Sequence, residues 1–248
     1  MGTDAIVVRP LVTAEEFEQA VELQKTVWGF EDIDLVPLRV FVVAGKIGGQ
    51  VLGAFEGKEM VGFLISLPGY RHGRPYLHSH MAAVVPAYQG QGIGRGLKLE
   101  QRREALARGL ELVEWTFDPL EFRNAHFNLE RLGVIARRYV RNLYGRTSSP
   151  LHGGLPTDRL VAEWWLASPR VEAAVRDERS GPGTAAEQIL LPAAIHELKM
   201  RDLEAAEQMQ SEVREQFEQW FGRGYAVTGF ERGEVGGTYL LESFEEEK

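Results

Sequence analysis

The 248-residue sequence contains no cysteine. This absence excludes a disulfide framework, a thiolate nucleophile, a CxxC redox pair and metal sites that depend on cysteine ligands. A chain of this length can bury roughly 70–75% of the surface that it exposes when unfolded, so it needs no covalent cross-links. We therefore expect one large domain, or one domain with a smaller partner, whose chemistry uses no protein thiol.

Long hydrophobic runs are also missing. No stretch approaches the roughly 18–20 apolar residues that a membrane helix needs. The first residues lack the basic and apolar regions of a secretory signal peptide, and Ile6 does not fit the myristoylation pattern. We expect a cytoplasmic protein that has no membrane partner.

Charge is distributed unevenly along the chain. Residues 1–170 carry 20 basic and 19 acidic side chains, whereas residues 171–248 carry 8 and 17. The formal net charge of -8 therefore originates in the last third. Residues 95–146 carry 11 basic and 7 acidic side chains, so this middle segment could attract a small polyanion despite the acidic total.

Hydrophobic periodicity and turn residues predict an alternation of strands and helices. Thr13 and Glu16 match a capping box at the start of the first helix. A linker rich in glycine and proline is expected at 176–188. The expected strands are 5–8, 50–56, 60–67, 76–85, 110–117, 134–139, 160–166, 189–191, 225–230 and 238–244, and the expected helices are 14–28, 37–44, 95–108, 124–132 and 202–221.

The segment from 78 to 96 carries the most specific pattern. It runs His-Ser-His-Met-Ala-Ala-Val-Val-Pro-Ala-Tyr-Gln-Gly-Gln-Gly-Ile-Gly-Arg-Gly, an apolar strand followed by alternate glycines and a helix. Glycine permits positive φ and the close approach of a ligand, and N–H groups at a helix N-terminus attract an anion. The pattern indicates a pyrophosphate cradle, with a glycine-rich turn of no ligand significance as the alternative. The dinucleotide fingerprint fails at Arg95 and Leu97, and the Gly-Lys-Ser/Thr of a P-loop is absent.

What remains is a Q-x-x-G-x-G pattern from Gln89 to Gly94. It resembles the acetyl-CoA-binding motif of the GNAT superfamily of N-acetyltransferases, whose loop binds the coenzyme A pyrophosphate through backbone amides. The resemblance implies acyl-CoA, either acetyl-CoA or succinyl-CoA, as co-substrate and no metal. The residues that it assigns to coenzyme A are Ala83, Val84, Val85, Gln89, Gly90, Gln91, Gly92, Ile93, Gly94, Arg95, Gly96 and Asn124.

Some of these residues have individual roles in the family. A backbone amide of the fourth strand, at the point where that strand bulges, holds the thioester carbonyl, which here implies Ala83, Val84 or Val85. An asparagine after the fifth strand contacts the pantetheine arm, which implies Asn124, with Asn128 as a substitute.

The order of the expected elements over about residues 5–168 also resembles this family. It implies an α/β (α+β) fold, with a mixed, mostly antiparallel sheet flanked by helices and a C-terminal β-α-β-β extension. We expect an acyl-CoA-binding catalytic domain at 1–175, a linker at 176–188 and an acidic extension at 189–248. Blocks at 115–120, 142–145 and 155–160 resemble larger GNAT-like proteins, some of which move acyl groups such as succinyl onto amino acids.

Acyl transfer to an amine needs a base, a polarised carbonyl and a proton for the departing thiolate. His78 and His80 lie two residues apart, so both point to one face of the expected strand. Neutral imidazole can accept the proton at pH 7, which makes both histidines candidate bases. The alternative is a pair of packed core histidines, and a zinc site would need a third ligand that is not close in sequence.

The general acid of the family is a tyrosine four residues before the glycine that closes the helix after the fifth strand. Counting back from Gly133 gives Leu129, so this sequence departs from the pattern. Tyr139 and Tyr144 are substitutes, of which we prefer Tyr144, although each could pack at the core edge with its hydroxyl in water. The thiolate could also leave without an acid.

Several basic side chains could meet anionic groups. The phosphates of the coenzyme could be contacted by Arg95, Lys98, Arg102 and Arg103, of which spacing places Arg95, Lys98 and Arg102 near one helix face. For Arg102 and Arg103 we favour a solvated face. Arg159 could bind a substrate carboxylate through two hydrogen bonds, and its alternative is an internal ion pair with Asp118 or Glu121.

The resemblance therefore implies an N-acyltransferase that moves acetyl or succinyl from acyl-CoA to the amine of a small molecule, with an amino acid as the favoured acceptor. A non-catalytic acyl-CoA sensor that binds a partner through its acidic tail is the alternative, and Leu129 supports it. We expect no nucleic-acid partner, because no recognised motif or aromatic platform is present. The C-terminal extension could serve a homodimer interface.

Overall fold

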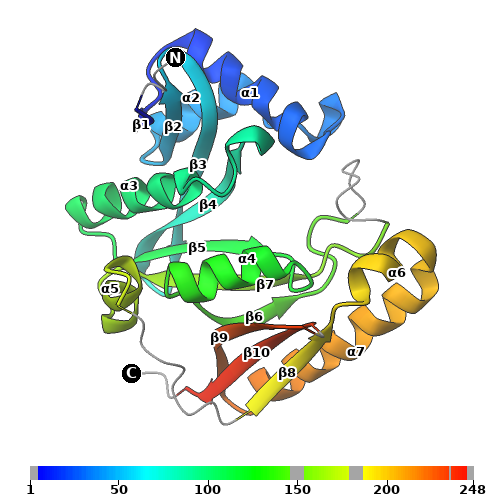
Figure 1. The fold of residues 1–248 in the computed structure, drawn as a ribbon. Coiled ribbons are helices and arrows are strands. Elements are labelled where there is room, and N and C mark those ends of the chain that lie inside the picture. The colour runs from blue at the N-terminus through cyan, green and yellow to red at the C-terminus, as the bar shows by residue number, and fades with distance from the viewer. Residues whose placement is uncertain (1–4, 146–153, 179–186, 235, 245–248) are drawn as a thin grey trace. The chain divides into compact units, whose positions relative to one another are not determined.

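The computed structural model describes residues 5–145, 154–178, 187–234 and 236–244 (Figure 1). The chain divides into two compact units, with the boundary between Glu114 and Trp115 inside strand β5 (Leu112–Phe117). The strand order is β1-β2-β3-β4-β5 in the first unit and β5-β7-β6-β9-β10-β8 in the second. Most neighbouring strands whose register is known are antiparallel, so the expected mixed, mostly antiparallel sheet with flanking helices is confirmed.

The first unit has two helices before its main strands and one after them. Its helix α1 begins at Thr13 with the predicted capping box, in which the Glu16 N–H donates to Thr13 Oγ1 and the Thr13 N–H donates to Glu16 Oε2. The elements are β1 (Val7–Pro10), α1 (Ala14–Trp28), α2 (Leu38–Lys46), β2 (Gln50–Glu56), β3 (Glu59–Arg71), β4 (Arg74–Val84) and α3 (Ile93–Ala107), with short 3-10 turns at Asp32–Asp34 and Pro86–Tyr88.

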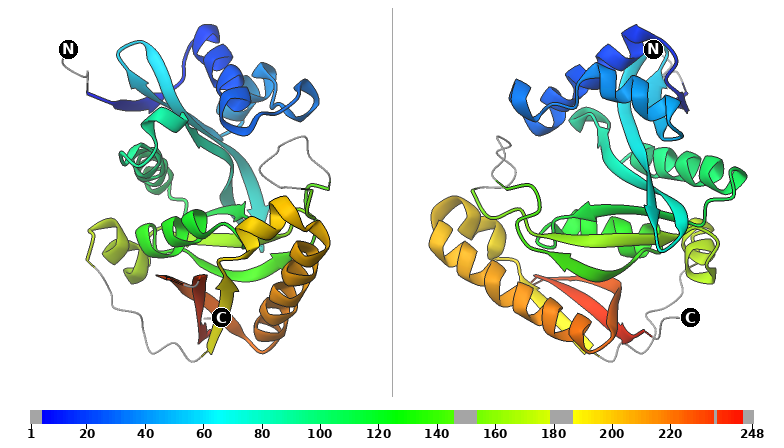
Figure 2. Two further views of the ribbon diagram at one scale, coloured as in Figure 1. Left: turned by 45° about the vertical axis from the view of Figure 1, so that its right-hand side comes forward. Right: turned by 180° about the vertical axis from the view of Figure 1, so that it is seen from behind.

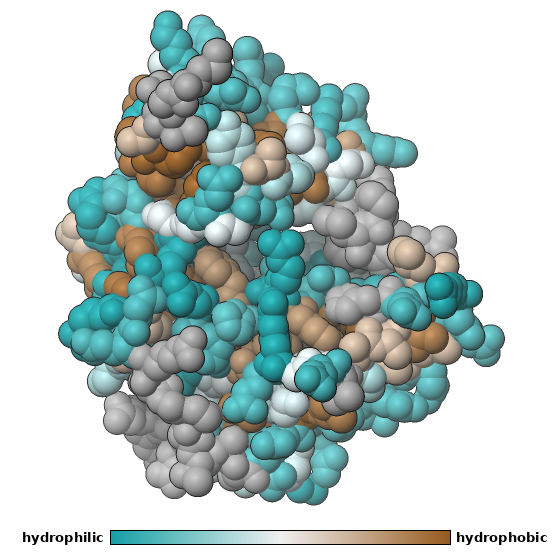
Figure 3. All heavy atoms as spheres, viewed as in Figure 1, coloured by the Kyte–Doolittle hydropathy of each residue, from teal (hydrophilic) through white to brown (hydrophobic). Residues whose placement is uncertain are grey.

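Hydrophobic side chains on the two faces of this sheet form two separate cores. On one face, Phe41 of α2 and Phe63 of β3 are fully buried in a cluster that includes residues of α1. On the other face, Leu97 of α3 packs against Leu52 and Leu64. Both views of Figure 2 show α1 and α2 on the side of the sheet opposite α3. On the face drawn in Figure 3, hydrophobic side chains of this unit gather over β1 and β2.

The β3–β4 hairpin is longer than the sequence predicts. Its ladder runs from Gly62↔Val84 to Arg71↔Arg74 and closes at a turn where His72 and Gly73 have positive φ. The outer part of the hairpin is exposed or half-buried, so it lacked the apolar run on which the shorter prediction rested. Strand β5 pairs with β4 in parallel over only two positions, of which one joins His78 to Glu114.

The second unit combines the chain from Trp115 onward with the C-terminal extension. Two of its helices, α5 and α6, were missed by the sequence analysis, and the expected helix 124–132 is a short α-helix followed by a π-helical turn at Phe127–Arg131. Its elements are α4 (Phe122–His126), β6 (Ile135–Val140), β7 (Arg159–Trp165), α5 (Pro169–Val175), β8 (Glu187–Pro192), α6 (Ile195–Arg201), α7 (Leu203–Gly222), β9 (Tyr225–Gly233) and β10 (Gly236–Ser243).

The extension continues the sheet of this unit. Strand β9 pairs with β6 at Ala136↔Val227, and the Tyr239 hydroxyl donates to the carbonyl of Pro119 at 2.7 Å. Phe217 of α7 is fully buried and stacks on Tyr139 of β6, with ring centroids 5.6 Å apart. Ala206, Val213 and Phe217 of α7 are therefore buried within the unit to which the helix belongs.

The predicted linker falls largely on residues 179–186, which lie outside the described residues. The division into 1–175, 176–188 and 189–248 therefore stays a prediction. In the described residues no helix is both long enough and apolar enough to cross a membrane.

The packing of α7 generates a stability prediction. We expect Phe217→Ala to lower the free energy of unfolding by about 3–5 kcal/mol, because it removes a fully buried ring and leaves a cavity. The measurement is denaturant unfolding followed by circular dichroism. Met200→Ala is the matched control, since Met200 is 86% exposed and its loss should change the value by less than about 0.5 kcal/mol. Equal effects of the two substitutions would contradict the packing of α7.

Candidate active site

A glycine loop connects β4 to α3 in the first unit. Gly90 and Gly92 have φ values of 80° and 82°, in the left-handed region. A Cβ added at either residue would meet nothing within 4 Å, so the backbone conformation, and not the space around it, requires glycine. The side chains of Gln89 and Gln91 donate to the carbonyls of Val84 and Ala87 at 3.0 and 3.2 Å, which ties the loop to the strand end and the 3-10 turn.

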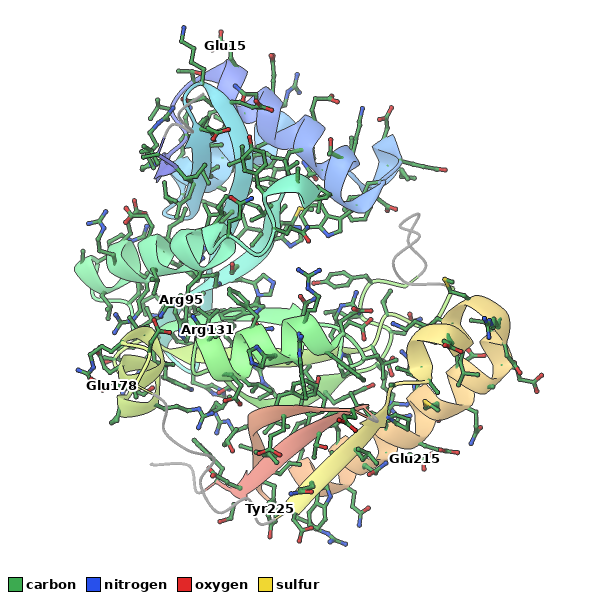
Figure 4. The ribbon with its side chains drawn as sticks, in the orientation of Figure 1. Glu15, Arg95, Arg131, Glu178, Glu215 and Tyr225 are labelled. Carbon is green, nitrogen blue, oxygen red and sulfur yellow. The ribbon has the colours of Figure 1, made fainter. Side chains whose placement is uncertain are left out.

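The N-terminus of α3 offers backbone donors at this loop. Gly92 is the N-cap and makes no side-chain cap, and the Gly96 N–H donates to the Gly92 carbonyl at 2.9 Å. The amides of Ile93, Gly94 and Arg95 precede that first helical bond, so the helix does not use them internally. Arg95, labelled in Figure 4, is half-buried on this first turn. Open glycine backbone followed by a helix N-terminus fits a pyrophosphate.

The end of β4 is regular, in contrast to the expectation of a bulge there. Ala83 and Val84 pair in order with β3, and the Val85 N–H donates to the Val61 carbonyl at 2.9 Å. Val85 is thus bonded within the sheet. The bulge lies upstream, where the register passes from Ser66↔Ser79 to Ile65↔Met81 and leaves His80 as the extra residue.

His78 and His80 lie close together, with ring centroids 6.4 Å apart. The register partner of His78 is Leu67, which packs against the core under α1 and α2, so the histidine pair lies on that face of β4. Burial lowers the pKa of both rings, and neighbouring His80 and Lys98 lower the pKa of His78 further. Both imidazoles are therefore neutral at pH 7 and can accept a proton.

Two charged residues near this pair were missed by the sequence analysis. Glu114 of β5 is buried, stands in register with His78 and forms an ion pair with Arg71 of β3. The signal that could have shown Glu114 is a single carboxylate within an otherwise apolar strand, because such a residue is seldom buried without a partner. In the described residues, no cluster of three or more His, Asp or Glu side chains could hold a metal ion.

The prediction that Lys98 contacts phosphate is wrong. Its side chain is 4% exposed, and its ammonium donates to Gln101 Oε1 at 2.5 Å and to Ser79 Oγ at 3.3 Å. Helical spacing alone placed it on the face of Arg95, but α3 turns Lys98 toward β3 and β4.

The remaining predicted residues lie in the second unit. Asn124 is exposed on α4, whereas Asn128 is buried and accepts from Trp115 Nε1 at 3.3 Å. Leu129, where the family has tyrosine, is buried. Lys199 pairs with Asp118 and Glu121, the two carboxylates that were alternatives for Arg159, at 3.7 and 3.2 Å.

Tyr144 and Arg159 are brought together by the blocks at 142–145 and 155–160. The guanidinium of Arg159 lies 5.4 Å from the centre of the Tyr144 ring. Tyr144 is 45% exposed, and its hydroxyl is 2.9 Å from Thr116 Oγ1. The amide N–H groups of Leu143 and Tyr144 donate to the carbonyl and Oγ1 of Thr157 at 3.0 and 2.9 Å.

The buried carboxylate of Asp158 connects the two blocks to each other and to β6 through hydrogen bonds. Asp158 is fully buried and accepts from the Tyr139 hydroxyl and the Asn142 N–H, each at 2.8 Å. Arg214 of α7 lies 3.4 Å from the same carboxylate. Burial, followed by the charge of Asp158, raises the pKa of Tyr139 well above its ordinary value, so Tyr139 is a weak candidate for a general acid.

Comparison with known proteins gives a family over part of the chain. The model of the acetyltransferase (GNAT) family matches residues 15–134. No curated protein matched the sequence at the significance required. Among solved structures, a GNAT-family protein from Desulfovibrio desulfuricans is similar with a TM-score of 0.52 and 18% identity, covering 66% of this chain and 100% of its own.

Two further structures show the same fold. The ribosomal-protein-S18-alanine N-acetyltransferase from Escherichia coli gives a TM-score of 0.52 at 17% identity, covering 66% of this chain and 96% of its own. The NatC complex bound to Gag peptide and CoA gives 0.50 at 18% identity, covering 64% and 96%. Residues 15–134 of this chain therefore belong to the acetyltransferase (GNAT) family, and the residues beyond them include an additional C-terminal region.

Proposed function

We propose that this protein transfers an acyl group, acetyl or succinyl, from acyl-CoA to the amine of a small molecule, with an amino acid as the favoured acceptor. The observation that carries the proposal is the loop of Gly90 and Gly92 at the uncapped start of α3, within the residues that belong to the family. Its donors fit the pyrophosphate of the coenzyme.

The chain's own groups would act as follows. His80 or His78, neutral at pH 7, accepts a proton from the acceptor ammonium. Of Ala83 and Val84, the Val84 N–H is the candidate donor to the thioester oxygen as negative charge develops there, because the Ala83 N–H, like that of Val85, faces β3 in the alternating ladder. The amine nitrogen forms a bond to the carbonyl carbon while the carbon–sulfur bond breaks, and the departing thiolate takes up a proton. Tyr144 stays a candidate for that donor, and Arg159 stays a candidate for a carboxylate of the acceptor.

A non-catalytic acyl-CoA sensor is the second candidate, and the buried Leu129 at the usual tyrosine position favours it. The two candidates separate in one assay, in which purified protein is mixed with acetyl- or succinyl-CoA and a panel of amines while free thiol is measured. Thiol release that depends on the amine supports the transferase. Binding of acyl-CoA by calorimetry without thiol release across the panel supports the sensor.

The loop geometry predicts the effect of one substitution on binding. Gly92→Ala should weaken acetyl-CoA binding about tenfold or more, because alanine at φ 82° costs roughly 1–2 kcal/mol and the loop would leave this conformation. Isothermal titration calorimetry measures the change. Gly45→Ala is the matched control, since Gly45 lies in α2, lacks a positive φ and has no atom within 4 Å of an added Cβ. An unchanged affinity in Gly92→Ala would remove this loop from the binding site.

The histidine pair predicts both a rate loss and a pH dependence. Replacing the base by glutamine, in His80→Gln or His78→Gln, should lower kcat about 100-fold or more while acyl-CoA affinity stays the same. Since burial depresses the pKa of each ring, the base form persists as the pH falls to about 6.5. The kcat/KM of the wild-type protein should therefore be flat at pH 7 and fall with a midpoint below about 6.5.

The control for this series is His72→Asn, because His72 is exposed in the hairpin turn with φ 48° and asparagine tolerates that conformation. The prediction fails if both glutamine variants keep the wild-type kcat, or if the midpoint lies above about 6.5, the ordinary pKa of histidine.

A further inference from the structure

Lys98 is the most unusual charged residue of the first unit. Lysine is among the residues least often fully buried, yet this side chain is 4% exposed in the middle of α3. Burial lowers the pKa of its ammonium well below the ordinary value. Nothing in the acyl-transfer chemistry proposed above uses this residue, so its burial calls for a different explanation.

The hydrogen bonds of Lys98 and its neighbour Gln101 reach one pair of residues on the sheet, Ser66 and Ser79. Its ammonium donates to Gln101 Oε1 and to Ser79 Oγ, and Gln101 Nε2 donates to Ser66 Oγ at 2.5 Å. Ser66 and Ser79 are register partners across β3 and β4. Lys98 and Gln101 of α3 therefore hold both members of one pair in the β-ladder.

That pair borders the bulge in β4. The next ladder step joins Ile65 to Met81 and skips His80, so Ser79 stands between the two histidines in sequence and next to the extra residue in space. A bulge locally interrupts the ladder bonds, and a side-chain network at its border restricts the neighbouring backbone. The same helix that starts at the glycine loop thus reaches the histidine-bearing segment through one buried side chain.

We propose that Lys98 is a positioning residue, which holds the β4 bulge through Ser79 and Gln101 and thereby sets the placement of His78 and His80. This inference rests on the proposed acyl transfer, in which one of the histidines is the base. Lys98 touches no reacting atom. It acts on the placement of the histidines through Ser79, in addition to the effect of its charge on the pKa of His78.

The test compares three variants of the full-length protein. Lys98→Met keeps the length of the side chain and removes the ammonium, and Ser79→Ala removes only the hydroxyl that Lys98 contacts. Arg103→Ala is the matched control, because Arg103 lies on the same helix, is largely exposed and pairs with Glu100. For each variant, kcat, the KM for acyl-CoA, the melting temperature and the NMR signals of the histidine ring protons are measured.

We expect Lys98→Met to lower kcat about tenfold or more, because a small displacement of a reacting group has effects of this size, while the KM for acyl-CoA changes less than twofold. Ser79→Ala should lower kcat in the same direction by a smaller factor. The ring signals of His78 and His80 should move in both variants and stay in place in Arg103→Ala. A purely structural role of Lys98 would instead lower the melting temperature without selectively moving these signals.

Three results would overturn the inference. One is a wild-type kcat in Lys98→Met, and another is a rise in the KM for acyl-CoA as large as the fall in kcat, which would assign Lys98 to coenzyme binding. If Lys98→Met does not fold, an unchanged kcat and unmoved ring signals in Ser79→Ala overturn it. Should the wild-type protein transfer no acyl group, the proposed function fails, and the ring signals still decide whether Lys98 positions the histidines.

Discussion

The pairing of β4 with β3 decides which groups of the first unit face one another. In a regular strand, side chains alternate between faces, so His78 and His80 would lie opposite Met81 and Ala83. The extra residue at His80 changes this alternation. Met81 and Ala83 join the hydrophobic core under α1 and α2, and His78 remains on the same face as its partner Leu67. The bulge therefore places two titratable rings beside an apolar layer, and that burial keeps both rings neutral.

Placing two buried histidines beside a bulge has a cost elsewhere in the unit. The bulge interrupts the ladder next to Ser66 and Ser79, whose hydroxyls face α3, and polar groups buried there need partners. Lys98 and Gln101 supply them. Burying an ammonium is costly, and burial lowers the pKa of Lys98. Burial of the ammonium lowers the stability of the fold, whereas its hydrogen bonds order the residues next to the bulge.

The local patterns of the sequence predicted those features of the fold and the site that depend only on residues close together in the chain. The capping box at Thr13 and the glycine loop at Gly92 are of this kind, because each requires particular residues at short spacing. The bulge at His80 and the burial of Lys98 depend on the register between strands and on how α3 rotates against the sheet, which no spacing rule contains. The burial of Glu114 likewise depends on contacts between strands, since its partner Arg71 lies on β3.

The C-terminal extension is a second example of a contact between distant elements that local sequence patterns do not predict. Its acidity suggested a separate tail, but its own Arg214 lies beside the buried carboxylate of Asp158. A buried carboxylate is tolerated when several donors satisfy it, and here Tyr139, Asn142 and α7 share that task. Asp158 immediately precedes Arg159 and holds the start of the block that carries Tyr144. The extension thus contributes, through Arg214, to the order of those two side chains.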